Sequence, residues 1–534
     1  MSQPNRDSLE KIIPARVVIG VTGHRIVDAE PTLITRIRSV IESIREMVPT
    51  LQNTHLVLSA LSPLAEGADR LVARQVLNTP DSMLEVVLPL EKDDYVKDFK
   101  TSQSKAEFEH LLSEARHVRQ LTATGSRDEA YERVGRYTVD HCDVLVAIWD
   151  GKHAAGQGGT GDIVQYARER NCPLFWIHTE DEGQVTVDVG RGLSARQFED
   201  LDVYNSERVD IPKFEKQLKG QCDSLVNQAN RANLPSKRLQ PTFEYVLGHY
   251  VRADLLALRY QHLYHRAGNL VYILAAAAIV LAAFQVLLLP DQPWILIAEV
   301  VFMVAILAVV WLGRRRRWHT KWIDYRFLAE RFRSALFMDV ANIDVAALRP
   351  PRHLSLSYSS NDWMVAAFLS VWSRRPRSQE RGSISTKGLT DFLCEAWIED
   401  QIRYHENTSR RHYRRHQRMF LASNVLFGLT LVAALLHVVH IGPQLLHSIL
   451  ALLAIACPAA AGGTTAIRTH RDYLRNSMRS AEMVRHLKEL EDRITRAEDR
   501  ETLLRLVAEI EQTMLHENED WRVVVRFHIP ELPA

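Results

Sequence analysis

Residues 270–312 read LVYILAAAAIVLAAFQVLLL, then the turn PDQP, then WILIAEVVFMVAILAVVWL, and this stretch decides the fold. Each apolar run has about 20 residues, the length at which an α-helix crosses the ~30 Å hydrocarbon core of a bilayer. The pattern returns at 419–439 and 445–467, joined by the turn HIGPQ. We therefore expect four membrane spans, at 270–289, 294–312, 419–439 and 445–467, arranged as two helical hairpins.

Positive charge is distributed unequally around these spans. Arg314–Arg317 follow the second span, and further Lys and Arg residues lie on both outer sides of the second hairpin, whereas neither connecting turn contains Lys or Arg. Because basic residues near spans stay in the cytoplasm, this predicts a multi-pass protein of the inner (cytoplasmic) membrane with cytoplasmic N- and C-termini. The polar N-terminal residues also lack the apolar core of a secretory signal. Buried hairpins of a soluble bundle are the alternative.

The composition of the chain argues against nucleic acid, metals and cofactors as binding partners. The 534 residues include 66 Lys and Arg against 65 Asp and Glu, a net charge of +1, so there is no bulk positive field for nucleic acid. The five cysteines are scattered without C-x-x-C spacing, which argues against a zinc or redox site. The juxtamembrane histidines 262, 265, 412 and 416 have no nearby carboxylate constellation. We expect no metal, no cofactor and no nucleic-acid partner.

The first 180 residues have a different pattern, in which short apolar runs alternate with amphipathic helical windows. Strands are expected at 16–21, 55–60, 84–88, 143–149 and 173–178. This alternation predicts an α/β fold with a Rossmann-like, doubly wound parallel sheet. The chain would thus combine an α/β head with an all-α membrane region. Ligands of such sheets bind beyond the carboxyl ends of the strands.

Three loops at those strand ends carry candidate ligand-binding residues. A glycine and a basic pair follow the first strand, EGAD follows the second, and a glycine-rich loop that opens a helix follows the strand ending at Trp149. Backbone N–H groups of such a loop, backed by the helix dipole, suit a phosphate; capping turns are the structural alternative. The loop is neither G-x-G-x-x-G nor a Walker A loop. The candidates are Gly23, His24, Arg25, Glu66, Gly67, Asp69, Arg136, Tyr137, Asp150, Gly151, Gly158, Gly159 and Thr160.

Gln285 and Glu299 fall within the two apolar spans of the first predicted hairpin. Glu299 lies five residues past Trp294, about 7.5 Å into the apolar layer at 1.5 Å per residue. An acid at that depth is a candidate for lining a cation path. A bond to Gln285 on the partner helix, or reach to the outer interface, is the alternative. Gln285 and Glu299 are therefore the predicted pore or intramembrane residues.

The GHR turn, the EGAD segment, the strand CDVLVAIWDG and the loop GGTGD together resemble the SLOG superfamily over about residues 14–180. This group contains the lonely-guy phosphoribohydrolases and the DprA proteins, so the resemblance implies nucleotide binding. The enzymes carry P-G-G-x-G-T-x-x-E, but here Gln157 replaces the proline and the nearest carboxylate to the glutamate is Asp162. We expect no firm catalytic residue, with Glu66 and Asp162 as weak acid/base candidates.

The membrane half resembles the SLATT domains, two-helix membrane effectors of bacterial conflict systems. The pattern WxxYRxLAExxR at 322–333 and the segment EIEQTMLHENEDW at 509–521 carry this likeness, and the unit is expected twice. The predicted organisation is a SLOG-like domain at 1–182, a linker at 183–240, a first hairpin unit at 241–345, a cytoplasmic connector at 346–395 and a second hairpin unit at 396–527.

The two resemblances imply a sensor-effector of anti-phage defence. The head would bind a nucleotide second messenger or an ADP-ribose-type ligand, and a homo-oligomer would open a pore in, or disrupt, the lipid bilayer. One alternative is a membrane-tethered nucleotide phosphoribohydrolase or N-glycosidase. Another is a constitutive channel or scaffold whose head only assembles subunits.

Overall fold

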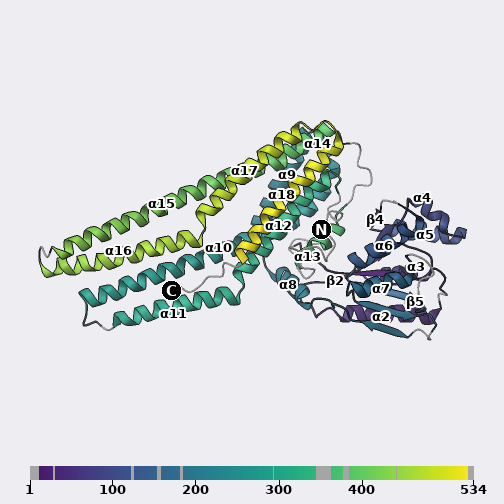
Figure 1. Ribbon diagram of the computed structural model, residues 1–534, viewed down its shortest axis with the longest axis horizontal. Coiled ribbons are helices and arrows are strands. Elements are labelled where there is room, and N and C mark those ends of the chain that lie inside the picture. The colour runs from purple at the N-terminus through teal and green to yellow at the C-terminus, as the bar shows by residue number, and fades with distance from the viewer. Residues whose placement is uncertain are drawn as a thin grey trace. The chain divides into compact units, whose positions relative to one another are not determined.

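The computed structural model describes residues 11–27, 30–121, 125–152, 158–180, 184–292, 294–343, 363–376, 384–439 and 442–526. The chain divides into two compact units. One contains Met1–Arg208 and Ala346–Arg375, and the other contains Val209–Val345 and Pro376–Ala534. The first is an α/β unit, and the described elements of the second are helices (Figure 1). The predicted combination of an α/β head with a helical membrane region is confirmed.

The head is built on a seven-stranded sheet with the order β4-β3-β2-β1-β5-β6-β7. Among the described strands, β7 alone is antiparallel to its neighbour. The chain runs outward from β1 to β4 and then returns to the other side of β1, so the order reverses between β1 and β5, the place where doubly wound sheets bind ligands. The strands are β1 (Ala15–Gly23), β2 (Leu56–Ser62), β3 (Met83–Leu88), β4 (His117–Gln120), β5 (Val144–Trp149), β6 (Leu174–His178) and β7 (Val185–Asp188).

Helices cover the sheet because its central strands are apolar on both faces. Val144–Ile148 of β5 are fully buried, as expected for a strand between two helical layers. The helices that pack on strands include α2 (Pro31–Glu46), α3 (Ala68–Leu77), α6 (Arg127–His141) and α7 (Thr160–Glu169). The unit also contains α5 (Ser102–Glu114), α8 (Ala195–Ser206), a short α4 (Lys92–Tyr95) and a 3₁₀ turn at Val96–Asp98. All five predicted strands are present, and the sequence reading missed β4 and β7.

A distant segment completes the head. Helix α13 (Trp363–Ser373) packs against β1 and α8. The Ser370 hydroxyl donates to the Pro14 carbonyl at 2.7 Å, and the Trp363 ring lies 5.4 Å from the Tyr204 ring between centroids. Part of the segment expected to be a connector, 346–395, therefore contributes to the head's core.

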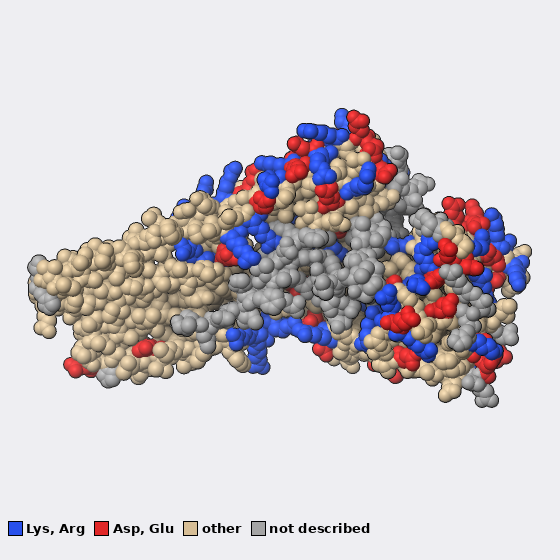
Figure 2. Space-filling model, viewed as in Figure 1, with Lys and Arg blue, Asp and Glu red and all other residues tan. Residues whose placement is uncertain are grey.

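Among its described residues, the second unit contains four helices that are long and apolar enough to cross a membrane: Ser236–Leu288, Trp294–Val340, Thr386–Val438 and Gln444–Thr495. In Figure 2 a broad surface of the helices that Figure 1 labels α10, α11, α15 and α16 carries few charged side chains. Val300, Phe427 and Val438 are among the large apolar residues exposed there. Because such a surface is unfavourable in water, its exposure fits contact with lipid.

The two hairpins have the same element order. The first comprises α10 (Ser236–Leu288), α11 (Trp294–Arg315) and α12 (Trp318–Val340); the second comprises α15 (Glu399–Val438), α16 (Gln444–His470) and α17 (Tyr473–Thr495). In each, one left-handed residue breaks the chain after the second span: Arg317 with φ 52° and Asp472 with φ 49°. Helices α9 (Ile211–Arg231), α14 (Thr386–Leu393) and α18 (Arg500–Arg526) and a π-helical turn at Cys394–Ile398 complete the unit.

The hairpins meet along α10 and α16. A Cβ placed on Gly463 of α16 would lie 3.2 Å from the Ala276 Cβ of α10, which shows how closely the two backbones approach. Small residues permit such contacts between membrane helices. Within the second hairpin, the Ser423 and Thr464 hydroxyl oxygens are 2.8 Å apart.

Candidate functional site

Backbone contacts bring together the loops after β1, β2 and β5. The His24 N–H donates to the Ile148 carbonyl at 3.0 Å, and the Ala68 N–H donates to the His24 carbonyl at 3.1 Å. Gly67 has φ +78°, and a Cβ there would lie 2.5 Å from the Arg25 carbonyl oxygen. A Cβ on Gly23 would lie 2.7 Å from the Ile148 carbonyl oxygen. Glycine is therefore required at both positions for the GHR and EGAD turns to meet.

His24 and Asp150 form a polar pair at the reversal of strand order. The His24 Nε2 lies 3.1 Å from Asp150 Oδ1, and the Asp150 N–H donates to the same nitrogen at 3.2 Å. The Lys152 N–H, which donates to Asp150 Oδ1 at 3.1 Å, lowers the pKa of that carboxyl, and His24 adds to the effect. Both side chains remain partly exposed, so a ligand can reach them. Gly151 follows with φ +85°.

Asp69 is the buried acid of this region. Its side chain accepts the Ala65 N–H at 3.2 Å, and only 4% of the residue is exposed. Burial raises the pKa of Asp69 to about 7, although the nearby Arg25 and Arg70 oppose the rise. The loop before it includes Leu64, a buried residue with φ +57°. A strained loop beside a carboxyl that titrates near neutrality is typical of functional sites.

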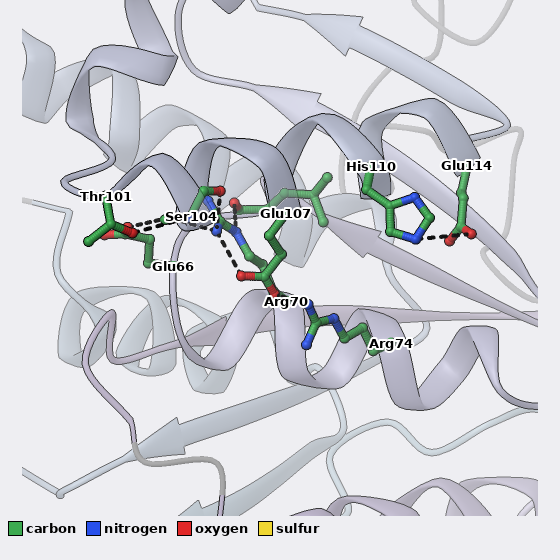
Figure 3. Close-up of polar contacts among 9 residues, drawn as sticks. Glu66, Arg70, Arg74, Thr101, Ser104, Glu107, His110 and Glu114 are labelled. Carbon is green, nitrogen blue, oxygen red and sulfur yellow. Dashed lines mark hydrogen bonds and ion pairs between the residues drawn. The ribbon is translucent and has the colours of Figure 1, made fainter.

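Arg70 holds the EGAD loop against α5, as Figure 3 shows. Its Nη1 donates to the Ser104 carbonyl and hydroxyl oxygens, both at 2.9 Å, and lies 3.2 Å from Glu107 Oε2. Its Nε donates to the Leu64 carbonyl at 3.0 Å. The Ser104 hydroxyl in turn donates to Glu66. Glu66 therefore helps to fix the loop.

Arg25 contacts a tyrosine of α6. The Arg25 guanidinium lies 4.8 Å from the centre of the Tyr131 ring, and the Tyr131 hydroxyl donates to Asp98. The sequence reading singled out neither Tyr131 nor the supporting Ser104, because their partners lie far along the chain. A single tyrosine in a helix rich in charged residues gives no local signal of this contact.

The glycine-rich loop also packs against α6. Gly158 has φ +79°, and a Cβ there would lie 2.7 Å from the Glu132 backbone nitrogen. Gly159 is the N-cap of α7, Thr160 is its first residue, and the Gly158 N–H donates to Asp162 Oδ2 at 3.1 Å. Asp162 thus caps its own loop. Gln157 lies outside the described residues.

Arg136 and Tyr137 make contacts along α6. Arg136 Nη2 pairs with Glu132 Oε1, and its guanidinium lies 4.9 Å from the centre of the Tyr166 ring in α7. Tyr137 stacks on His141 with 3.7 Å between ring centroids, and Arg119 of β4 lies over its ring. These contacts tie the two residues to α7 and β4.

In the membrane region, Gln285 is buried and Glu299 is half-buried. Within the described part of the chain no hydrogen bond joins these two side chains, so the structure does not contain the bond that was the alternative to an ion path. No group of three or more His, Cys, Asp or Glu residues suited to a metal occurs among the described residues.

The WxxYRxLAExxR pattern forms a buried charge network in α12. Arg326 lies 3.0 Å from Asp254 of α10 and also pairs with Glu330, which is 2% exposed. Arg333 contacts Glu330 as well and donates to Gln401 of α15 at 2.9 Å. The motif thus joins three helices, α10, α12 and α15, through ion pairs and hydrogen bonds inside the protein.

Comparison with protein families matches residues 394–521 to the SMODS and SLOG-associating 2TM effector domain 1. This part of the chain is a SLATT-type transmembrane effector domain. The SLATT domain begins at the π-helical turn, contains both spans of the second hairpin and ends within α18. The prediction of a SLATT-type membrane effector is confirmed for this hairpin. A comparison of the chain with curated proteins gives no match.

Within the SLATT domain, ion pairs hold the helices outside the apolar spans. Lys488 of α17 lies 2.8 Å from Glu406 of α15, and Arg493 lies 2.6 Å from Glu509 of α18. The side chains of Leu515–Trp521, the end of the quoted C-terminal segment, lie outside the described residues. The SLOG-like character of the head and the SLATT-like character of the first hairpin stay predictions.

Proposed function

We propose that this protein is a membrane-embedded sensor-effector of bacterial anti-phage defence. In this proposal the head binds a nucleotide-derived ligand, and the two hairpins open a pore in the inner membrane in response. The observation that carries the proposal is the presence, in one chain, of a SLATT domain and an α/β head with a polar site at the reversal of its strand order. An effector joined to a binding domain is suited to regulation by a ligand.

The head's site has the chemistry that a nucleotide needs. Arg25 and His24 supply cationic or hydrogen-bonding groups for a phosphate, and the N-terminus of α7 lies after the neighbouring strand. Asp150 offers a carboxylate of the kind that accepts hydrogen bonds from ribose hydroxyls. The ring of Tyr131, beside Arg25, offers a face for a base.

The shared element order of the two hairpins supports a duplicated SLATT unit. Each has a long entering helix, a short turn, an apolar helix and a left-handed break before its exit helix. We propose that several chains assemble and that Glu299 and Gln285 lie near the path for ions. Charged residues placed in membranes generally face a pore or a bundle interior.

Gating requires that the ligand bind one state of the protein more tightly than the other. The network of Arg326, Glu330 and Arg333 is a candidate for the element that changes, because it joins both hairpins through α12 and α15. Buried ionic networks have few alternative arrangements that keep every charge paired. Movement of α12 would therefore favour discrete states.

Binding is tested by thermal unfolding of the full chain with cyclic nucleotides and ADP-ribose derivatives. One ligand class is expected to raise the melting temperature, because a ligand stabilises the state that it binds. Gly159→Glu places a carboxylate at the N-cap of α7 and is expected to abolish the shift. Gly220→Glu, in open space on α9, is the matched control and should keep it. An unchanged shift in Gly159→Glu would contradict the proposed site.

The alternative of an enzyme has one observation in its favour, which is Asp69. A buried carboxyl with a pKa of about 7 beside Arg25 is suited to acid/base catalysis, whereas Glu66 and Asp162 are engaged with Ser104 and Gly158. Release of free base from nucleoside monophosphates, lost in Asp69→Asn, would favour a phosphoribohydrolase. Binding without turnover favours the sensor.

A further inference from the structure

Three arginines gather where the two hairpins meet, just outside the apolar spans. Arg411 and Arg415 lie on successive turns of α15, and Arg471 immediately follows α16. The Arg471 Nε donates to Asn269 Oδ1 of α10 at 3.3 Å, so the guanidinium is held at the junction of the three helices. We call these three residues the interfacial arginine cluster.

The groups that face the cluster do not neutralise it. From α10 they are His265 and Asn269; from α15, His412; from the end of α16, His470; and from the start of α17, Tyr473, whose ring lies 5.5 Å from that of His412. In the part of the chain that the structure describes, no acidic side chain pairs with a cluster arginine. Asp472, the adjacent acid, lies 3.7 Å from Arg475.

The titration of neighbouring groups shows the same excess of positive charge. Burial, followed by the charges of Arg411, Arg415 and Arg471, lowers the pKa of His412 to about 4. Burial and then Arg471 lower the pKa of His265 to about 2. Burial also lowers the pKa of Arg471, where Tyr473 opposes the fall and Arg415 adds to it. Both histidines are therefore neutral at pH 7, and the arginines carry the charge.

The cluster lies at the depth of lipid headgroups. Arg415 precedes the third predicted span by four residues, and Arg471 follows the fourth span by four residues. At 1.5 Å per residue, each lies about 6 Å outside the hydrocarbon layer. Phospholipid phosphates occupy this layer, and guanidinium groups bind phosphate oxygens in pairs of hydrogen bonds.

We propose that Arg411, Arg415 and Arg471 bind the phosphate of an anionic phospholipid at the junction of the two hairpins. The lipid phosphate supplies the negative charge that the protein does not place there. Since the arginines come from α15 and α16 and Arg471 also contacts α10, the lipid stabilises the contact between hairpins. The proposal requires the membrane position of the SLATT domain and is independent of any ligand in the head.

The test compares lipids with the full chain in a neutral detergent. Phosphatidylglycerol is expected to raise the melting temperature, whereas phosphatidylcholine, a zwitterion, is expected to raise it less at equal concentration. Inorganic phosphate tests whether a free anion is sufficient, and it should not change the melting temperature. Equal shifts with both lipids, or a shift with inorganic phosphate that matches phosphatidylglycerol, would overturn the proposal.

Single substitutions distinguish lipid binding at the interfacial arginine cluster from attraction of lipid by surface charge in general. Arg415→Gln and Arg471→Gln should each weaken phosphatidylglycerol binding about tenfold, as expected for loss of a charged hydrogen-bond donor. Arg410→Gln removes the same charge from the turn of α15 that also carries Arg411, but Arg410 lies 4.0 Å from Glu406, and the variant should bind lipid as the wild type does. Equal loss in Arg410→Gln and Arg415→Gln would show a diffuse charge effect and overturn the site.

A conservative variant shows whether weaker lipid binding comes from the lost hydrogen-bond donors or from misfolding. Arg415→Lys keeps the charge but loses the paired donors, so it should fold and bind phosphatidylglycerol more weakly than wild type and more tightly than Arg415→Gln. Native mass spectrometry of the wild-type chain provides a second measurement. Retention of phosphatidylglycerol in preference to phosphatidylcholine supports the proposal, and equal retention contradicts it.

Discussion

At the scale of single residues, the buried carboxyl of Asp69 lowers the stability of the folded protein by an amount that depends on pH. This carboxyl is buried near Arg25 and Arg70. Burial of the Tyr95 hydroxyl raises the pKa of that group, and the negative charge of Asp69 adds to the rise. A natural sequence retains such a group where a function compensates for the lost stability. The same position is thus informative about both stability and ligand binding.

The expected pH dependence follows from the raised pKa of Asp69. The folded chain holds this proton more tightly than the unfolded chain, whose carboxyl titrates near 3.8. The free energy of unfolding therefore falls by roughly 4 kcal/mol as the pH rises from about 4 to about 7, and stays lower above that range. Asp69→Asn keeps the acceptor for the Ala65 N–H but cannot ionise.

At pH 8, Asp69→Asn should therefore melt above the wild type, by on the order of 10 °C. At pH 5 the two proteins should melt within a few degrees of each other. Differential scanning fluorimetry of both proteins at the two pH values makes the comparison. Parallel melting curves at both values would show that Asp69 does not titrate near neutrality in the folded protein.

At the scale of helices and strands, local sequence predicts the spans and central strands better than the edges and long-range contacts. The spans and β5 are uninterrupted runs of apolar residues. Such a run by itself predicts a segment that is buried in lipid or in the protein core. β4 has only four residues, His117–Gln120, and alternates in exposure at the sheet's edge. Helix α13 packs on β1 through Ser370 and Pro14, which are 356 residues apart, and no local pattern reveals such a partner.

In the candidate site, too, local sequence predicts some features, and long-range contacts are not predicted. The glycines and the GHR and EGAD turns are visible in sequence because strand ends and glycine-rich loops have recognisable spacing. Arg70 and Ser104 lie 34 residues apart, and their contact depends on how α5 returns to the sheet. Burial, which sets the pKa of Asp69, is likewise a property of the assembled head.

The network in α12 gives a prediction for a single helix. Glu330→Ala leaves Arg326 and Arg333 partly buried without this carboxylate, so the free energy of unfolding should fall by about 3–5 kcal/mol. Glu482→Ala removes an acid from the exposed pair with Arg485 in α17 and is the control, expected to melt as the wild type does. Equal melting of both variants would mean that the α12 network contributes little to stability.

At the scale of the whole molecule, opposite charge signs nearly cancel but occupy different places. The net charge is only +1, yet the described spans carry long uncharged surfaces and arginines gather at their ends. This segregation predicts the topology. Both hairpin turns are expected outside the cytoplasm, and both termini inside.

Single cysteines test that topology in intact cells. Asp291→Cys, in the first turn, should react with a membrane-impermeant maleimide added outside, whereas Arg316→Cys should react only after permeabilisation. Of the native cysteines, Cys394 is half-buried and the others are buried, which limits background labelling. The reverse pattern of labelling would invert the proposed orientation.

The most direct measurement of the sensor-effector proposal is ion flux from liposomes that contain the full chain with its head outside. Flux should be low alone, rise on addition of the nucleotide that stabilises the head, and stay low in Gly159→Glu. Gly220→Glu should respond as the wild type does. Equal flux with and without nucleotide, or nucleotide binding with no flux, would contradict the account.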